Sequence, residues 1–475
     1  MKKLMLIYPT GDLYQRGEDR CQVNINASIS NSMRACNDLG YIASILKNDY
    51  QILLKDYMSE KKSFNDFKND FISYLPDVLF ISTTNGSIYE DLEFINNVKA
   101  LKKDVIIILK GALFFNINQQ VLDNLPLNNV DYLIGGEVEF IIKDLLNSHF
   151  CDKNKLKEIQ GIAYKNNEKW IVNNLQFFNE DLDSLPFPDR SLMNNKLYLN
   201  PLNNKKMATI STSRGCPSGC IFCLSPVISG KKVRFRSPKS VLFEMIECFD
   251  KYKIDNFFFK ADTFTINKAW VLELCNLIIN SKLHNKIQFV ANSRVNTIDE
   301  EMLFLMKKAG CSMIALGLES GSDDTLNQMK KGVTVQDNIR AVKLIKSAGI
   351  QVFGFYLIGF PFENKEHLAQ TKKLIFDLDT DFIEVSIVTP FYGSELYSML
   401  NLNNQVLGKD SFKNNLSCSD NFSIPQLQAF RKDIILKYHL RLKYILGRIF
   451  NKNINLSLLK NYVVYGFRLL KNLFY

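Results

Sequence analysis

Short apolar runs alternate with amphipathic stretches along most of this chain, and this alternation constrains the fold more than any other feature. Strands that alternate with helices in this way predict a parallel sheet with helices on both faces. We therefore expect a doubly wound α/β domain over residues 1–147. Its expected strands are Leu4–Tyr8, Tyr50–Leu54, Val78–Ser82, Val105–Leu109 and Tyr132–Ile134. Its expected helices are Asn31–Lys47, Phe64–Tyr74, Tyr89–Lys102, Asn118–Leu125 and Val138–Asn147.

A second alternating region covers residues 207–395 and repeats strand and helix six times. Six such repeats predict a partial (β/α)6 barrel, whose active site lies at the carboxyl ends of the strands. The expected strands are Met207–Thr212, Asn256–Lys260, Ile287–Ala291, Met313–Leu318, Val352–Ile358 and Phe382–Val388. The expected helices are Lys239–Tyr252, Lys268–Ser281, Asp299–Ala309, Val335–Ala348 and Lys365–Phe376.

Two further segments complete the predicted organisation. A connector over residues 148–206 contains a hairpin pattern, with expected strands at Gly161–Tyr164 and Lys169–Val172. Residues 396–475 form a basic helical C-terminal region. The chain carries a formal charge of +10, but ten basic residues and one acid lie between Pro425 and Tyr475. The rest of the chain is therefore close to neutral.

The basic tail has two interpretations. Basic residues interleaved with apolar and aromatic ones can form an amphipathic helix that makes peripheral contact with an anionic membrane. Alternatively, the tail is a helical cap packed on the barrel, with a solvated basic face, and this is the outcome that we expect. No nucleic-acid-binding module accompanies the charge, so no nucleic-acid partner is expected. No apolar run reaches the roughly 18 residues of a membrane-spanning helix, and we expect a cytoplasmic protein.

Three of the ten cysteines are bunched. Cys216, Cys220 and Cys223 follow the first strand of the second region, spaced by three and then two residues. Three thiolates on one short loop can bind three irons of a 4Fe–4S cluster. A structural zinc site normally takes four protein ligands, and no fourth Cys or His is nearby. Most of the other cysteines sit singly in apolar segments and are interpreted as buried thiols: Cys36, Cys151, Cys248, Cys275 and Cys311.

Small and hydroxyl residues follow several strands of the first region. Parallel sheets bind ligands at this carboxyl edge, so the residues could line a site for a large ligand. They could equally be ordinary turn residues. The first strand is not followed by a glycine fingerprint for a dinucleotide, which makes that ligand unexpected. The candidate residues are Thr83, Thr84, Gly111, Gly135, Gly136 and Glu137.

The cysteine spacing and its position after the first barrel strand resemble the radical SAM superfamily. This resemblance implies that the open iron of the cluster chelates S-adenosylmethionine (SAM), which is reductively cleaved to a deoxyadenosyl radical. Phe222 matches the aromatic position beside the adenine, and the segment around Glu319 and Ser320 resembles the ribose-contacting one. Gly359, with Glu363 nearby, resembles the fifth-strand segment near the adenine. Arg294 is a candidate partner of the methionine carboxylate, and Asp262 stands where the family has a small-residue and Glu segment.

A doubly wound domain ahead of such a barrel resembles the cobalamin-binding radical SAM subfamily, which includes methyltransferases and the anaerobic magnesium-protoporphyrin cyclase. The resemblance implies that cobalamin binds at the carboxyl edge of the first sheet, at the six candidate residues given above. Two departures stand out: Lys110-Gly111-Ala112 replaces the usual Gly-Gly-Pro, and no Asp-x-His-x-x-Gly offers an imidazole to cobalt. Many members of the subfamily also lack that histidine.

The resemblance implies a cobalamin-dependent methyltransferase acting on an unactivated carbon of a small-molecule or lipid-like substrate, with a reductant such as flavodoxin or ferredoxin. A non-methylating oxidative cyclisation or rearrangement is the alternative. A catalytically lapsed cofactor-binding protein is a third possibility, against which the intact cysteine trio argues.

Overall fold

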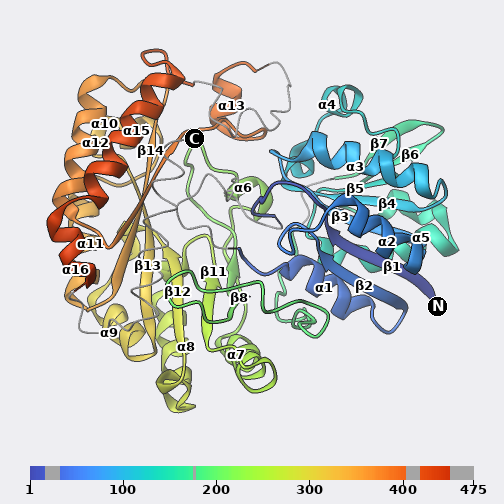
Figure 1. The fold of residues 1–475 in the computed structure, drawn as a ribbon, viewed down its shortest axis with the longest axis horizontal. Helices are drawn as coiled ribbons and strands as arrows, with labels where there is room; N and C mark the ends of the chain where they lie inside the picture. Colours follow the sequence, from blue (N-terminus) through green and yellow to red (C-terminus); the bar gives the residue numbers. More distant parts are fainter. Residues whose placement is uncertain (17–32, 175–177, 403–417, 450–475) are drawn as a thin grey trace.

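The computed structural model describes the chain except for residues 17–32, 175–177, 403–417 and 450–475. Figure 1 shows two lobes, one built on each of the two alternating regions. The N-terminal lobe contains a seven-stranded sheet in the order β2-β1-β3-β4-β5-β6-β7. The C-terminal lobe contains a six-stranded sheet in the order β15-β14-β13-β12-β11-β8. The α/β class expected from the sequence is confirmed.

The first five strands of the N-terminal sheet are parallel, and β6 and β7 extend it as an antiparallel hairpin. The hairpin predicted in the connector is thus an edge of this sheet. The strands are β1 (Lys2–Tyr8), β2 (Tyr50–Asp56), β3 (Val78–Ser82), β4 (Ile106–Lys110), β5 (Tyr132–Ile134), β6 (Ile162–Asn166) and β7 (Lys169–Val172). The helices are α1 (Asn37–Leu46), α2 (Phe64–Tyr74), α3 (Ile88–Leu101), α4 (Gln119–Asn124) and α5 (Ile142–Cys151).

All six strands of the C-terminal sheet are parallel, and their order follows the chain. They are β8 (Met207–Ser211), β11 (Asn256–Lys260), β12 (Gln288–Ser293), β13 (Cys311–Glu319), β14 (Gln351–Ile358) and β15 (Phe382–Ile387). The connecting helices are α7 (Pro238–Tyr252), α8 (Lys268–Asn280), α9 (Glu300–Lys308), α10 (Asp323–Gln328), α11 (Val335–Ser347) and α12 (Lys365–Leu378). A short antiparallel pair, β9 (Ser213–Arg214) and β10 (Arg234–Phe235), brackets helix α6 (Ser225–Ile228).

Burial and helix caps explain why these segments fold as they do. Every residue of β3, a central strand, is buried, as expected for a parallel strand covered on both faces, and every residue of the edge strand β8 is buried as well. Helices α2 and α11 each begin with a capping box, formed by Ser63 with Asp66 and by Thr334 with Asp337, which satisfies backbone N–H groups at the helix start. Because the strands of the C-terminal sheet are parallel, the carboxyl ends of β8 and β11 to β14 lie at one edge of the sheet.

The described part of the C-terminal tail packs on the C-terminal sheet. It comprises α13 (Glu395–Met399), α15 (Ile424–His439) and α16 (Leu442–Ile449). Helix α15 buries Leu427, Ile434, Ile435 and Tyr438, while Arg431 donates through Nε to the Val385 carbonyl of β15 at 2.6 Å. This portion is a cap, as expected; residues 450–475 lie outside the described ranges.

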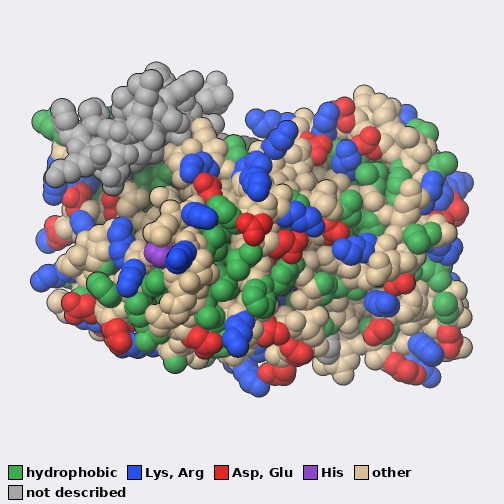
Figure 2. All heavy atoms as spheres, turned by 90° about the horizontal axis from the view of Figure 1, so that it is seen from below, with side chains coloured by type: hydrophobic (Ala, Val, Ile, Leu, Met, Phe, Trp, Pro, Cys, Tyr) green, Lys and Arg blue, Asp and Glu red, His purple; other side chains and the backbone are tan. Residues whose placement is uncertain are grey.

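Surface charges are mixed in sign over the face in Figure 2, where basic and acidic side chains alternate around a central group of hydrophobic ones. This matches the near-neutral charge of the chain ahead of the tail. Within the described residues, the structure contains no helix that is both long and apolar enough to span a membrane.

A candidate radical SAM site between two sheets

The three bunched cysteines lie on the loop between β9 and α6, at the edge of the C-terminal sheet that faces the N-terminal lobe (Figure 1). Cys216 and Cys220 are buried and Cys223 is partly exposed. Helix α6, which follows the third cysteine, packs through Leu224 and Ile228 on Ala112 and Phe115, just after β4 of the other lobe. The cysteine loop is therefore held beside the carboxyl edge of the N-terminal sheet.

Asp262 fixes both ends of the cysteine loop. One carboxylate oxygen accepts the backbone N–H of Gly215 at 3.2 Å, and the other accepts the hydroxyl of Ser225. Gly215 has a left-handed φ of +101°, and a Cβ there would come within 2.0 Å of the Lys232 carbonyl oxygen, so only glycine fits. At Gly219 a Cβ would meet nothing within 4 Å, so close packing of the loop depends on Gly215 rather than on both glycines.

Arg294, after β12, reaches the loop. Its Nη1 lies 3.5 Å from Cys220 Sγ, and its Nη2 donates to the Lys331 carbonyl. Lys331 in turn forms a buried ion pair of 2.6 Å with Glu319 at the end of β13. Glu319 has a φ of +61°, a strained value for a residue with a side chain, and the ion pair holds that carboxylate. The structure thus brings together two predicted site residues, Arg294 and Glu319, through Lys331, which the sequence reasoning missed.

The end of β14 carries a buried carboxylate. Glu363 accepts the backbone N–H groups of Gly359 at 2.6 Å and Phe360 at 3.0 Å. Burial raises its pKa to about 7, although the two N–H groups act in the opposite direction. Phe222 of the cysteine loop meets Phe360 edge to face, with ring centroids 5.8 Å apart. Phe222 therefore packs beside the turn that contains Gly359. Ser320, by contrast, is fully buried, and its hydroxyl lies 2.9 Å from that of Thr371.

The candidate residues at the N-terminal edge are tightly packed. The Thr83 hydroxyl donates to Asp91 at 2.5 Å, and that of Thr84 lies 3.0 Å from the Ser87 hydroxyl. A Cβ at Gly111 would come within 2.7 Å of Thr83, and one at Gly135 within 2.0 Å of the Phe114 carbonyl oxygen. The fold itself therefore requires glycine at these two positions. Gly136 directly follows Gly135 in the chain and lies beside Gly161.

Glu137 and Glu139 form a buried ionic cluster with arginines of the other lobe. Arg214, which directly precedes the cysteine loop, lies 3.2 Å from Glu137 and 2.7 Å from Glu139. Arg234 of β10 pairs with Glu137 at 2.9 Å. All four side chains are at most 5% exposed. Sequence reasoning missed both arginines because the pairing spans about 75–97 positions of chain.

Of the five cysteines predicted to be buried thiols, Cys151 is exposed at the end of α5, so that interpretation was wrong for it. The other four are buried, as predicted: Cys36, Cys248, Cys275 and Cys311. The apolar neighbours of Cys151 face the sheet while its thiol lies on the outer side of the helix. No group of three or more His, Cys, Asp or Glu side chains in the described ranges is placed to hold a single metal ion. The thiols of a cubane cluster each bind a different iron, so a 4Fe–4S site does not require that they converge on one point.

Comparison with known proteins identifies the domain that carries the cysteine loop. Residues 210–375 match the model of the Radical SAM superfamily. A protein called an uncharacterized methyltransferase, from Pyrococcus horikoshii, is 28% identical over 87% of this chain and 89% of its own length. The anaerobic magnesium-protoporphyrin IX monomethyl ester cyclase of Cereibacter sphaeroides is 26% identical over 76% of this chain, which spans 60% of that enzyme's length.

The same fold occurs in a solved structure of the cobalamin-dependent S-adenosylmethionine radical enzyme OxsB. It superposes with a TM-score of 0.72 at 16% identity and covers 100% of this chain and 72% of the other. The match includes both lobes, so the order of a doubly wound sheet followed by the six-stranded sheet is shared. The matching domain model and the cysteine trio on its loop show that residues 210–375 of this protein form a radical SAM domain.

Proposed function

We propose that this radical SAM enzyme transfers a methyl group, with cobalamin as the carrier, to an unactivated carbon of a small-molecule substrate. The observation that carries the proposal is the cysteine loop seated against the carboxyl edge of the N-terminal sheet, through the packing of α6 on Ala112 and Phe115. When bound, the 4Fe–4S cluster supplies the electron that cleaves SAM, and cobalamin supplies a transferable methyl group.

Residues of the C-terminal lobe fit the cluster and SAM. Cys216, Cys220 and Cys223 offer three sulfur ligands, and Asp262 keeps their loop closed at both ends. Arg294 places a cation against Cys220 Sγ, where it would also be available to the carboxylate of SAM. We propose SAM-binding roles for the six residues named from the sequence: Phe222, Asp262, Arg294, Glu319, Ser320 and Gly359.

Residues at the carboxyl edge of the N-terminal sheet offer fewer side-chain contacts to cobalamin than the C-terminal lobe offers to the cluster and SAM. Lys110, at the end of β4, is 1% exposed, and its Nζ lies 3.7 Å from the buried Asp38 carboxylate, an ion pair too long for a hydrogen bond. A buried ammonium that makes no hydrogen bond within the described residues suits a ligand rich in amide oxygens, because a buried donor without a hydrogen bond is costly. OxsB, which shares the fold, was solved with aqua-cobalamin and S-adenosylmethionine bound. We propose that Thr83, Thr84, Gly111, Gly135 and Gly136 form the floor of this site, and that Glu137 supports it from within the ionic cluster.

The proposal includes partners and location. A low-potential donor such as flavodoxin or ferredoxin would supply the electron. The domains are proposed as 1–147 for cobalamin, 148–206 as connector, 207–395 for radical chemistry and 396–475 as C-terminal region, with the correction that the hairpin of β6 and β7 inside the connector belongs to the sheet of the first domain. Because reduced thiols and iron–sulfur clusters persist in reducing compartments, we propose a cytoplasmic location.

Anaerobic reconstitution tests the cluster. We expect about four irons per chain and SAM cleavage to deoxyadenosine. Cys220→Ala should lose both while remaining folded, because the loop lies outside the sheet. Cys151→Ala, which removes the exposed thiol of α5, is the matched control and should keep both. Cleavage of SAM by the Cys220→Ala variant at the wild-type rate would refute the assignment, and so would wild-type protein that binds no iron.

A second test separates methylation from cyclisation, which the similarity to the magnesium-protoporphyrin cyclase favours as the alternative. Holoenzyme is incubated with SAM labelled in its methyl group, and products are analysed by mass spectrometry. Methylation puts the label into the substrate; cyclisation removes hydrogens and leaves the label in SAM and methionine. Label-free products, or wild-type protein that takes up no cobalamin, would replace the methyl-transfer proposal with the alternative.

A further inference from the structure

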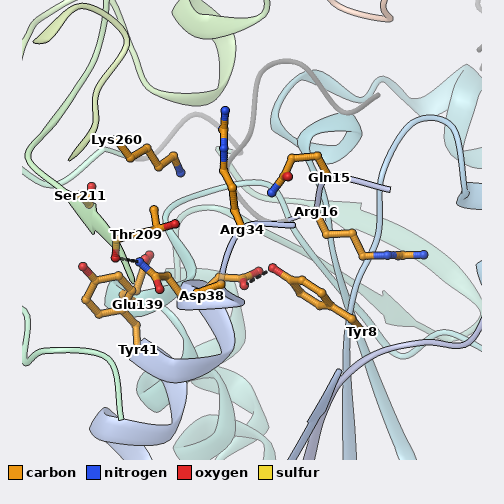
Figure 3. Close-up of a pocket in the computed structure, with 12 residues that line it drawn as sticks. Tyr8, Gln15, Arg16, Arg34, Asp38, Tyr41, Glu139, Thr209, Ser211 and Lys260 are labelled. Carbon is orange, nitrogen blue, oxygen red and sulfur yellow. Dashed lines mark hydrogen bonds between the residues drawn. The ribbon is translucent and has the colours of Figure 1, made fainter. Parts of the chain in front are cut away.

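A polar hollow lies between the two lobes (Figure 3). It is lined from the N-terminal side by residues at the end of β1 and the start of α1, and from the C-terminal side by residues of β8 and β11. None of the proposed SAM- or cobalamin-binding residues lines it. Lys260, which ends β11, lies two positions before Asp262 in the chain, so the hollow borders the segment that holds the cysteine loop.

Three charged groups of this lining make buried contacts within the protein. Asp38 accepts the Tyr8 hydroxyl at 2.6 Å and that of Ser82 at 2.9 Å. Glu139 is committed to Arg214, as described above, and Arg16 pairs with Asp91 at 2.8 Å. These contacts build the walls of the hollow and fix its shape.

Arg34 and Lys260 reach the hollow from opposite lobes, and both are partly exposed. Figure 3 shows their side chains and the Gln15 amide directed toward the same space, away from the buried Tyr8–Asp38 pair. The Arg34 guanidinium lies over the ring of Phe258, 4.2 Å from its centroid, which restricts its orientation. Lys260 is held through its backbone, whose carbonyl accepts the N–H of Thr212 at 2.9 Å.

We propose that Arg34 and Lys260 bind an anionic group, a carboxylate or a phosphate, on the substrate of this enzyme. A guanidinium and an ammonium that converge from two elements form charge-assisted hydrogen bonds to such a group, and the Gln15 amide adds a neutral donor. Because one cation comes from each lobe, the anion also bridges them. The inference rests on the proposed function, since it assigns the substrate of that same site.

The location favours the substrate over SAM. The SAM carboxylate has its own candidate cation in Arg294, beside Cys220. The hollow lies at the end of β1 and the start of α1, beside the proposed cobalamin edge, because its lining residue Asp38 accepts the Ser82 hydroxyl after β3 and lies 3.7 Å from Lys110 Nζ at the end of β4. Cobalamin uptake by the variants therefore distinguishes that cofactor from the substrate. An anion at Arg34 and Lys260 would anchor a substrate whose remaining part extends toward the cysteine loop.

Inorganic phosphate is the probe for this site. Phosphorus NMR line broadening at constant ionic strength measures its binding to the reconstituted full chain, with acetate as a competitor. Wild-type protein should bind phosphate and release it to acetate. Arg34→Gln/Lys260→Gln should weaken phosphate binding by roughly tenfold or more. The control Arg340→Gln/Lys343→Gln removes the same charge from the exposed face of α11 and should bind phosphate like wild type.

Measurements on the same samples distinguish the sources of the anion. Iron content, SAM affinity and cobalamin uptake should be equal in wild type and in Arg34→Gln/Lys260→Gln. Loss of SAM affinity or of cobalamin uptake in that variant would assign the anion to a cofactor and overturn the inference. So would phosphate binding that is absent in wild type or unchanged in the variant. If the double variant does not fold, the single variants Arg34→Gln and Lys260→Gln are compared with Arg34→Lys, which should retain part of the affinity.

Failure of the proposed function has a different signature. A protein that binds no iron and cleaves no SAM would contradict the radical chemistry whatever its affinity for phosphate. A protein that cleaves SAM but shows no phosphate binding dependent on Arg34 and Lys260 would contradict the anion site alone.

Discussion

The surroundings of a single carboxylate set its pKa, and Glu363, in the turn after β14, is the clearest case. Its side chain is fully buried, and one oxygen accepts two backbone N–H groups of the β14 turn. Burial raises its pKa from 4.5 to about 7. The folded protein therefore binds a proton at this group more tightly than the unfolded chain does. Its contribution to stability is fully present below pH 4.5 and is lost as the pH rises through 7.

Glu363→Gln should remove this pH dependence, because the amide keeps an oxygen for the two N–H groups and does not titrate. The free energy of unfolding of wild type minus that of the variant should fall by about 3 kcal/mol between pH 4.5 and pH 8. Urea titrations of both proteins across this range measure the difference. A difference that stays constant with pH would mean that folding does not raise the pKa of Glu363.

For single residues, the sequence could identify candidates for the site but not the side chains that they contact in the folded protein. The cysteine spacing alone predicted Cys216, Cys220 and Cys223, because three thiols so close in the chain have few other uses. Lys331 and Arg214 carried no comparable signal. Lysines and arginines occur throughout this chain, and only tertiary contact distinguishes one that is buried against a carboxylate from one that is solvated.

Among elements, hydrophobic periodicity predicted the long helices and the strands of both sheets closely. The predicted Asn256–Lys260 and Phe64–Tyr74 coincide with β11 and α2, since each has a clear period and a turn or cap at its ends. The Val138–Asn147 helix was wrong in detail: Val138–Phe140 is a separate 3-10 turn, and α5 begins at Ile142. Helix α6 was missed because four residues that include a proline present no period.

Helix α15 is anchored by Leu427, which is fully buried and packs against the left-handed turn at Gly359, where a Cβ would come within 2.7 Å of it. Leu427→Ala leaves a cavity between the cap and the C-terminal sheet and should cost about 2–5 kcal/mol of unfolding free energy. Chemical denaturation measures this, and Leu440→Ala, at a leucine that is 60% exposed, should leave stability unchanged. Equal stability of Leu427→Ala and wild type would show that the cap is dispensable to the sheet.

On the scale of the whole molecule, the two lobes are joined by hydrogen bonds and ion pairs that no single-lobe pattern could predict. Asn37 of α1 donates to the Thr209 carbonyl of β8 at 2.8 Å, and the connector residue Arg190 forms a buried pair of 2.7 Å with Glu244 of α7. The ionic cluster of Glu137, Glu139, Arg214 and Arg234 completes the junction. The cysteine loop starts directly after Arg214, so the junction also sets where the loop lies relative to the N-terminal sheet.

Arg214→Met tests this coupling. The variant leaves the buried Glu139 without the guanidinium that now lies 2.7 Å away, and removing one partner of a buried pair costs about 3–5 kcal/mol. Lys232→Met breaks an exposed pair with Glu180 and should change stability by less than about 1 kcal/mol. Arg214→Met/Glu139→Met removes both charges and should recover most of the loss, since the cost comes from the charge left behind. Urea denaturation compares the four proteins, and limited proteolysis shows whether the lobes separate. If the double variant is no more stable than Arg214→Met, the cluster does not act through its charges, and the lobes are held by the apolar contact of α6 with Ala112 and Phe115.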